Sequence, residues 1–159
     1  MKTSIVFRLA TVFILLAIAI GSTGCNKEEI TQIITPTVND DLVTVWRPVS
    51  VTIDDVSVPV AEFFEFSEDA VIFNLVISSD ATYHTEELDS SDQVLHYEDG
   101  TAVSFGQTLT LTMTSNNGEA VSPPVIVAAG NFDVTGVTLT FTMEDGDSAI
   151  VLVFNNWLT

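Results

Sequence analysis

The chain has 159 residues, with four Lys and Arg against 22 Asp and Glu, and its formal charge at pH 7 is −18. Such an acidic balance repels phosphate backbones, so it excludes nucleic acid as a partner. A single cysteine excludes a disulfide within the chain. The fold must therefore depend on apolar burial, and the length suits one domain with its own core.

Residues 1–24 have the pattern of a signal peptide. Lys2 and Arg8 give a positive start, and the segment from Leu9 to Ile20 is uncharged and largely apolar. Twelve residues span about 18 Å as a helix, which is too short for a bilayer core of about 30 Å. The segment therefore predicts a cleaved signal rather than a membrane span.

Small residues at positions 21–24 lead directly into Cys25, the only cysteine. Thr23-Gly24-Cys25 resembles the lipobox of bacterial lipoproteins, although Ser22 stands where that family favours Leu or Val. The resemblance implies cleavage before Cys25, a diacylglycerol group on its thiol and an acyl chain on its new amine. The alternatives are an ordinary secretory signal with an incidental cysteine, or a short membrane anchor.

The residues that follow the cysteine bear on location. Lys27-Glu28-Glu29 resembles the signal that sends Bacteroidetes lipoproteins to the outer face of the outer membrane. The resemblance implies surface display, and the periplasmic face is the alternative. Residues 25–41 are polar and predict a flexible tether. The mature chain would carry Lys27 and Arg47 against the 22 acids, a formal charge of −20.

Residues 42–159 predict one all-β domain of short antiparallel strands. Apolar and polar residues alternate at 108–114 and 138–143. This pattern places Leu109, Leu111, Leu139 and Phe141 on an inward face. Further strands are expected at 43–53 with an edge or bulge at Pro48, and at 70–77, 82–88, 94–98, 121–128 and 149–154. Turn-forming residues at 89–92, 116–118 and 144–147 separate the hairpins, and composition leaves 61–66 open between strand and helix.

Such a meander forms either a closed up-and-down barrel or a two-sheet, immunoglobulin-like β-sandwich. Three sequence segments favour the barrel, because they resemble segments of bacterial lipocalin-like lipoproteins. They are residues 42–46, which end in Trp46; Asp80-Ala81-Thr82-Tyr83; and residues 107–112. That family implies a lipocalin-like barrel with the tryptophan at its closed end. Thr44 stands where the family has a glycine. No arginine follows Arg47 in the sequence, so none is available from a later strand to pack on Trp46.

The hairpin over 82–98 carries the only two histidines. Because side chains alternate between the two faces of a strand, His84 shares a face with Glu86 on the first strand, and His96 shares a face with Glu98 on the second. If the turn is centred on Ser90, His84 lies opposite His96, and the four side chains form a candidate Zn²⁺ site. A register shift of one residue sends the histidines to opposite faces and leaves an exposed polar hairpin.

Acidic turns at 54–55, 67–69 and 144–147 offer oxygen ligands for Ca²⁺, although none has the spacing of an EF-hand. The chain lacks a nucleophile elbow, a phosphate loop and Cys/His zinc spacing, so catalysis is not expected. The sequence favours a monomeric, lipid-anchored, non-enzymatic barrel that binds a small molecule or a partner protein. The alternative is a structural or adhesion-type sandwich without a pocket.

Overall fold

The computed structural model describes residues 36–158, which lie within a compact unit spanning 34–159. Cys25 and the Lys27-Glu28-Glu29 segment lie outside the described residues. The elements are η1 (Asp40–Leu42), β1 (Val45–Ile53), β2 (Val56–Val58), α1 (Val60–Phe63), β3 (Ile72–Ile77), β4 (Thr82–Leu88), β5 (Val94–Phe105), β6 (Thr108–Asn116), β7 (Glu119–Thr135), β8 (Thr138–Asp145) and β9 (Ser148–Asn156). No helix in this part of the chain is both long and apolar enough to cross a membrane.

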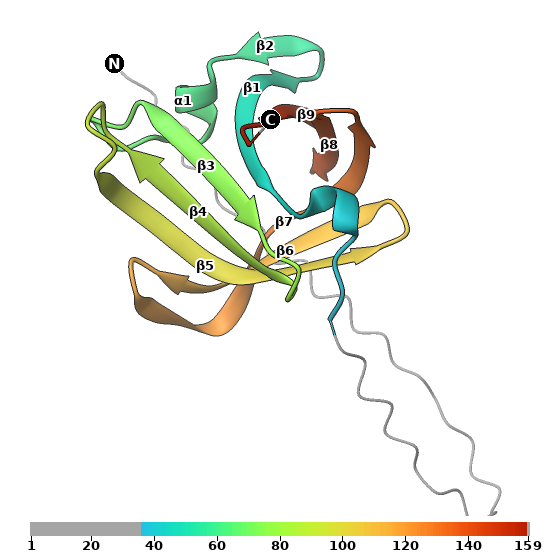
Figure 1. Cartoon of the computed structure of the whole chain (residues 1–159). Coiled ribbons are helices and arrows are strands. Elements are labelled where there is room, and N and C mark those ends of the chain that lie inside the picture. The colour runs from blue at the N-terminus through green and yellow to red at the C-terminus, as the bar shows by residue number, and fades with distance from the viewer. Residues whose placement is uncertain (1–35, 159) are drawn as a thin grey trace, which may run out of the picture. The chain divides into compact units, whose positions relative to one another are not determined.

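Eight of the nine strands form a closed antiparallel barrel, with β2 as an extra strand on β1 (Figure 1). Strands β3 to β9 follow one another in chain order, and β9 pairs with β1 from Trp46↔Asn156 to Ile53↔Ile150. The predicted all-β, lipocalin-like barrel is therefore confirmed. The two-sheet sandwich is wrong, because the pairing of β1 with β9 leaves no second sheet.

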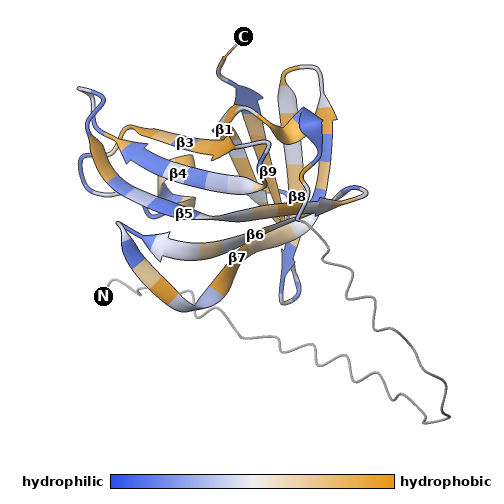
Figure 2. Cartoon of the chain, turned by 60° about the horizontal axis from the view of Figure 1, so that its bottom comes forward, coloured by the Kyte–Doolittle hydropathy of each residue, from blue (hydrophilic) through white to orange (hydrophobic). Residues whose placement is uncertain are grey.

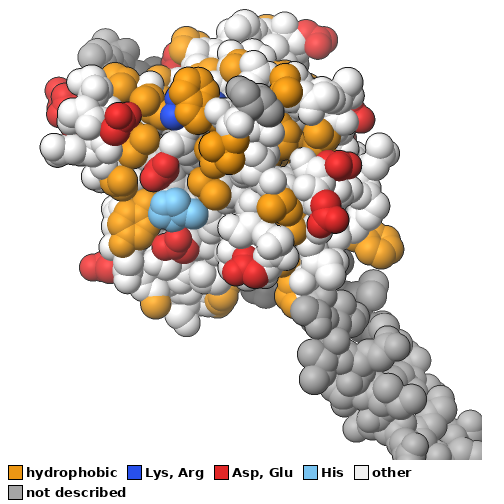
Figure 3. Space-filling view, in the orientation of Figure 1, with side chains coloured by type: hydrophobic (Ala, Val, Ile, Leu, Met, Phe, Trp, Pro, Cys, Tyr) orange, Lys and Arg blue, Asp and Glu red, His pale blue; other side chains and the backbone are white. Residues whose placement is uncertain are grey.

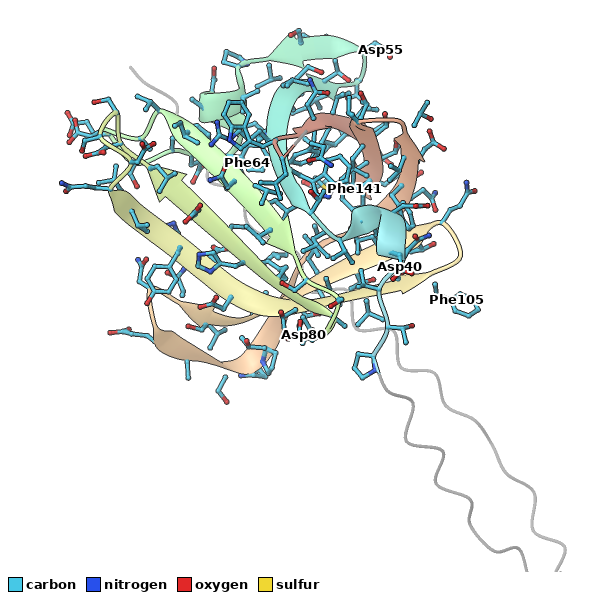
Figure 4. The ribbon with its side chains drawn as sticks, in the orientation of Figure 1. Asp40, Asp55, Phe64, Asp80, Phe105 and Phe141 are labelled. Carbon is cyan, nitrogen blue, oxygen red and sulfur yellow. The ribbon has the colours of Figure 1, made fainter. Side chains whose placement is uncertain are left out.

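The alternation read from the sequence explains the core. Leu109, Leu111, Leu139 and Phe141 are buried, as their inward positions predict. With Trp46, Phe132 and Phe154 they fill the barrel with large apolar side chains, and Figure 4 shows Phe141 among them. Apolar burial of this kind replaces the disulfide that the chain cannot form.

The segment before the first strand belongs to the barrel. Leu42 is fully buried, and its carbonyl accepts a hydrogen bond from the Trp46 indole N–H at 2.9 Å. The backbone of Ser104 donates to the Thr37 carbonyl, and the Ser104 hydroxyl accepts from the Asn39 N–H. The compact unit thus begins before the predicted tether boundary at 41, because Thr37 and Asn39 are already bonded to β5.

The barrel wall has a gap between β1 and β3. These strands pair only at Val45↔Val76 and Trp46↔Leu75. The pairing stops just before Pro48, which has no N–H to donate, and β1 has a bulge between Pro48 and Ser50. The bulge confirms the irregularity predicted at Pro48. Of residues 61–66, which composition left open between strand and helix, 61–63 belong to the short helix α1 beside this gap (Figure 1).

Candidate functional site

The hairpin of β4 and β5 does not bring the predicted zinc ligands together. His84 pairs with Asp99, and Glu87 pairs with His96. Opposite residues share a face of the sheet, so His84 with Glu86 faces outward while His96 with Glu98 faces the inside of the barrel. The prediction that the two histidines lie opposite each other is wrong. In the described residues no group of three or more His, Cys, Asp or Glu has an arrangement that could hold a metal ion.

A bulge accounts for the error in register. The loop between β4 and β5 is centred on Ser91, and Leu88 pairs with Val94 across it. Continued without interruption, this register would leave both histidines on one face. The next pair is Glu87↔His96, so Leu95 is an extra residue on β5 and inverts every later side chain. Nothing in the sequence marks Leu95 as a bulge.

Three aspartates at turns accept hydrogen bonds from the protein itself. Asp89 Oδ1 accepts from the backbone of Ser91 and Gln93, and the Gln93 bond is the main cause that lowers the pKa of Asp89. A hydrogen bond from the Thr82 hydroxyl lowers the pKa of Asp80 in the same way. Asp54 accepts from Ser148 and from the Ala149 N–H. The contacts of Asp80 and Asp89 are typical of Asx turns, and those of Asp54 join its turn to the start of β9.

The outward face of the sheet carries a row of polar side chains from β1 to β5. The Arg47 Nε–H donates to Asn74 Oδ1 at 2.7 Å, and Asn74 Nδ2 donates to Glu86 Oε1 at 2.7 Å. His84 lies 3.9 Å from Glu86 and 2.7 Å from Asp99. Figure 3 shows a histidine on this face between acidic side chains, beside an apolar area. Asn74 thus separates the arginine from the nearest carboxylate of the row.

The gap in the wall forms an open groove of about 360 Å³ next to this row. It is lined by Arg47, Pro48, Val60, Ala61, Phe66, Val71, Ile72 and Phe73, whose side chains are apolar except for the guanidinium, and polar backbone atoms are also exposed in it. Figure 2 shows the mainly apolar β3 beside a more polar β4, and Figure 4 places Phe64 near the gap. Stacking of the Phe64 and Phe66 rings on Phe73, at 4.6 and 5.9 Å between centroids, fixes the wall of the groove near α1.

Arg47 is held rigidly at the groove. Its Cζ lies 3.5 Å from the centre of the Trp157 ring, a cation–π contact. Within the described residues no carboxylate lies within 4.0 Å of the guanidinium, and no hydrogen bond engages its two terminal nitrogens. The sequence contained a signal for this site, because Arg47 is the only Lys or Arg after position 27.

The inner face of β4, β5 and β6 carries a second group of polar side chains, called here the inner cluster: Tyr83, Glu87, His96, Glu98 and Asn116. Glu87, only 6% exposed, accepts from the Ser67 N–H at 2.8 Å and lies 3.5 Å from His96. His96 Nε2 lies 2.9 Å from Asn116 Oδ1. Burial, together with the charge of Glu87, raises the pKa of Glu98 against the opposing effect of His96. Only His96 and Glu98 of this cluster were singled out from the sequence.

Comparison with family models, with curated proteins and with solved structures gives no match to this chain.

Proposed function

We propose that the protein is a monomeric, lipid-anchored barrel of the cell envelope, displayed at the outer surface, that binds a small amphipathic anion in the groove between β1 and β3. It acts by binding and performs no catalysis. The observation that carries the ligand class is the combination of an apolar groove with a single guanidinium that has no described carboxylate partner. The resemblance of the Cys25 segment to a lipobox supports the lipid anchor, and Lys27-Glu28-Glu29 supports display at the outer surface.

The size and lining of the groove support a small ligand. A volume of about 360 Å³ is near the lower end of the range for small-molecule sites. The apolar lining would take up an alkyl chain, at about 0.8 kcal/mol for each buried CH₂. The open side of the groove faces solvent, so we expect a ligand that is only partly enclosed, with micromolar to sub-millimolar affinity.

The charge arrangement supports an anionic head group. Asn74 accepts from the Arg47 Nε–H and donates to Glu86, so it links the two charged groups without direct pairing. The terminal nitrogens of Arg47 can then donate two hydrogen bonds to a carboxylate or a phosphate. Stacking on Trp157 restricts the guanidinium before the ligand arrives, which lowers the entropic cost of binding.

The acidic surface gives this proposal a distinctive salt dependence. A mature formal charge of −20 opposes the approach of any anion at low ionic strength. At 0.1 M salt the repulsion between charges more than about 10 Å apart is largely screened, whereas the close contact with Arg47 is screened less. The affinity for an amphipathic anion should therefore rise between about 10 mM and 150 mM salt.

The experiment is a calorimetric titration of residues 34–159 with decanoate, since the closed barrel and its core lie within that unit. Ala61→Trp places a large ring in the groove, and it should abolish binding. Ala120→Trp makes the same change at an exposed position on β7 and should leave the affinity unchanged. Equal binding by the two variants would show that decanoate binds elsewhere.

A further inference from the structure

The inner cluster contains one buried polar group without a partner and one half-buried carboxylate. The Tyr83 hydroxyl belongs to a residue that is only 2% exposed, and it has no hydrogen-bond partner among the described residues. Glu98 makes no hydrogen bond with the described residues through its carboxylate, and burial is the main cause that raises its pKa. Buried polar groups are normally paired, so an unpaired hydroxyl beside a half-buried carboxylate requires a reason.

The register places these two side chains on the same inward face, at diagonal positions that long side chains can span. Tyr83 pairs with Gly100, and a side chain at Gly100 would lie only 2.5 Å from Tyr83 Cε1, so the ring packs flat over the glycine. Glu98 is the next inward-facing residue on β5. The charge of Glu98 is, after burial, the largest cause that raises the pKa of Tyr83. Both side chains therefore belong to the inner cluster.

The other members of the cluster are already engaged. Glu87 is held by Ser67 and His96, and His96 is also held by Asn116. The groups of the cluster that can still form hydrogen bonds with a ligand are therefore the Tyr83 hydroxyl and the Glu98 carboxylate. The charge of Glu87 lies in the same cluster. This set is rich in acceptors and negative charge, and it is separate from the groove, whose lining includes none of these residues.

We propose that Tyr83 and Glu98 form a second binding site, which takes a protonated primary amine. The ammonium group donates one N–H to the Glu98 carboxylate and another to the phenolic oxygen, and its charge relieves the repulsion between Glu98 and Glu87. An amine fits better than a metal ion, because the described carboxylates and histidines do not form a metal-binding group. The acidic surface concentrates such cations around the barrel. This site does not depend on the groove.

The test is a calorimetric titration of the full chain, purified in nonionic detergent, with n-butylammonium chloride. Tetramethylammonium chloride is the control ligand, because it has the same charge but no N–H to donate. Butylammonium should bind and tetramethylammonium should not. Equal binding of both ions would overturn the proposal, as would binding of Ca²⁺ in place of butylammonium.

Three variants place the site. Tyr83→Phe should weaken butylammonium binding about fivefold, and Glu98→Gln more than about tenfold, as expected for a neutral and a charged hydrogen bond. Asp99→Asn removes the same charge from the neighbouring residue, whose side chain faces outward, and should change the affinity less than about twofold. Should Glu98→Gln fail to fold, Tyr83→Phe decides, since it keeps the ring. Unchanged affinity in Tyr83→Phe overturns the site.

Discussion

Replacing Tyr83 by Phe should stabilise the barrel. The substitution keeps the aromatic ring that covers Gly100 and removes only a hydroxyl that is buried without a partner. Burying such a group unpaired costs about 1–3 kcal/mol, because the unfolded chain hydrogen-bonds it to water. We therefore expect Tyr83→Phe to raise the free energy of unfolding by about 1 kcal/mol or more at pH 7.

Guanidinium-induced unfolding measures this effect directly. The midpoint should rise while the slope of the free energy with denaturant stays the same, since both proteins expose the same surface. Tyr97→Phe is the matched control, because Tyr97 is only partly buried, and its effect should stay within about 0.5 kcal/mol. Destabilisation of Tyr83→Phe by about 1 kcal/mol would refute the reasoning, because it would mean that the hydroxyl has a partner inside the folded barrel.

The same variant has a pH signature. Burial, with the charges of Glu98 and Asp99, raises the pKa of Tyr83 above its ordinary value of 10.0. A raised pKa means that the ionisation of Tyr83 has no effect on stability below about pH 10 and lowers the free energy of unfolding as pH rises further, because the unfolded chain ionises first. Tyr83→Phe lacks this loss, so its advantage over the wild type should widen above pH 10 by up to about 1.4 kcal/mol per pH unit. A constant difference between pH 9 and pH 11 would contradict the burial of the hydroxyl.

Three further predictions concern the anchor and the packing. Cys25→Ala should release the protein from the membrane fraction, because acyl chains contribute about 0.8 kcal/mol per buried CH₂, and retention would contradict lipidation. Replacing Lys27, Glu28 and Glu29 together by alanine should protect the domain from protease added to intact cells, while the protein stays in the membrane fraction. Unchanged cleavage by the protease would contradict the proposed export signal. Gly100→Ala should cost about 2 kcal/mol or more in denaturant unfolding, because its Cβ would overlap the Thr112 carbonyl oxygen and the Tyr83 ring, and a cost below about 0.5 kcal/mol would contradict that packing.

Much of the barrel was predictable because β-strand burial has a period of two. The alternation at 108–114 and 138–143 identified four core residues correctly, and Asn117, Gly118 and Gly146 have the positive φ angles that their turns suggested. Pro48 marked the irregularity of β1. These features are local, so the sequence alone carries them.

The sites were less predictable because they depend on long-range geometry. One extra residue, Leu95, inverts the faces of β5 and separates His84 from His96. The groove arises where β1 separates from β3, two strands whose register no local pattern defines. The inner cluster needs Tyr83 and Glu98 to meet across β4 and β5, and the hydroxyl's lack of a partner is visible only in the folded chain.

The central claim, that the groove binds an amphipathic anion through Arg47, is tested most directly by comparing decanoate with 1-decanol. The two ligands share an alkyl chain and differ in the charge of the head group. Arg47→Met keeps most of the apolar stem and removes the guanidinium. The account predicts that this variant binds decanoate about tenfold or more weakly, while its affinity for decanol changes less than about twofold. Equal losses for both ligands, or unchanged binding of decanoate, would contradict it.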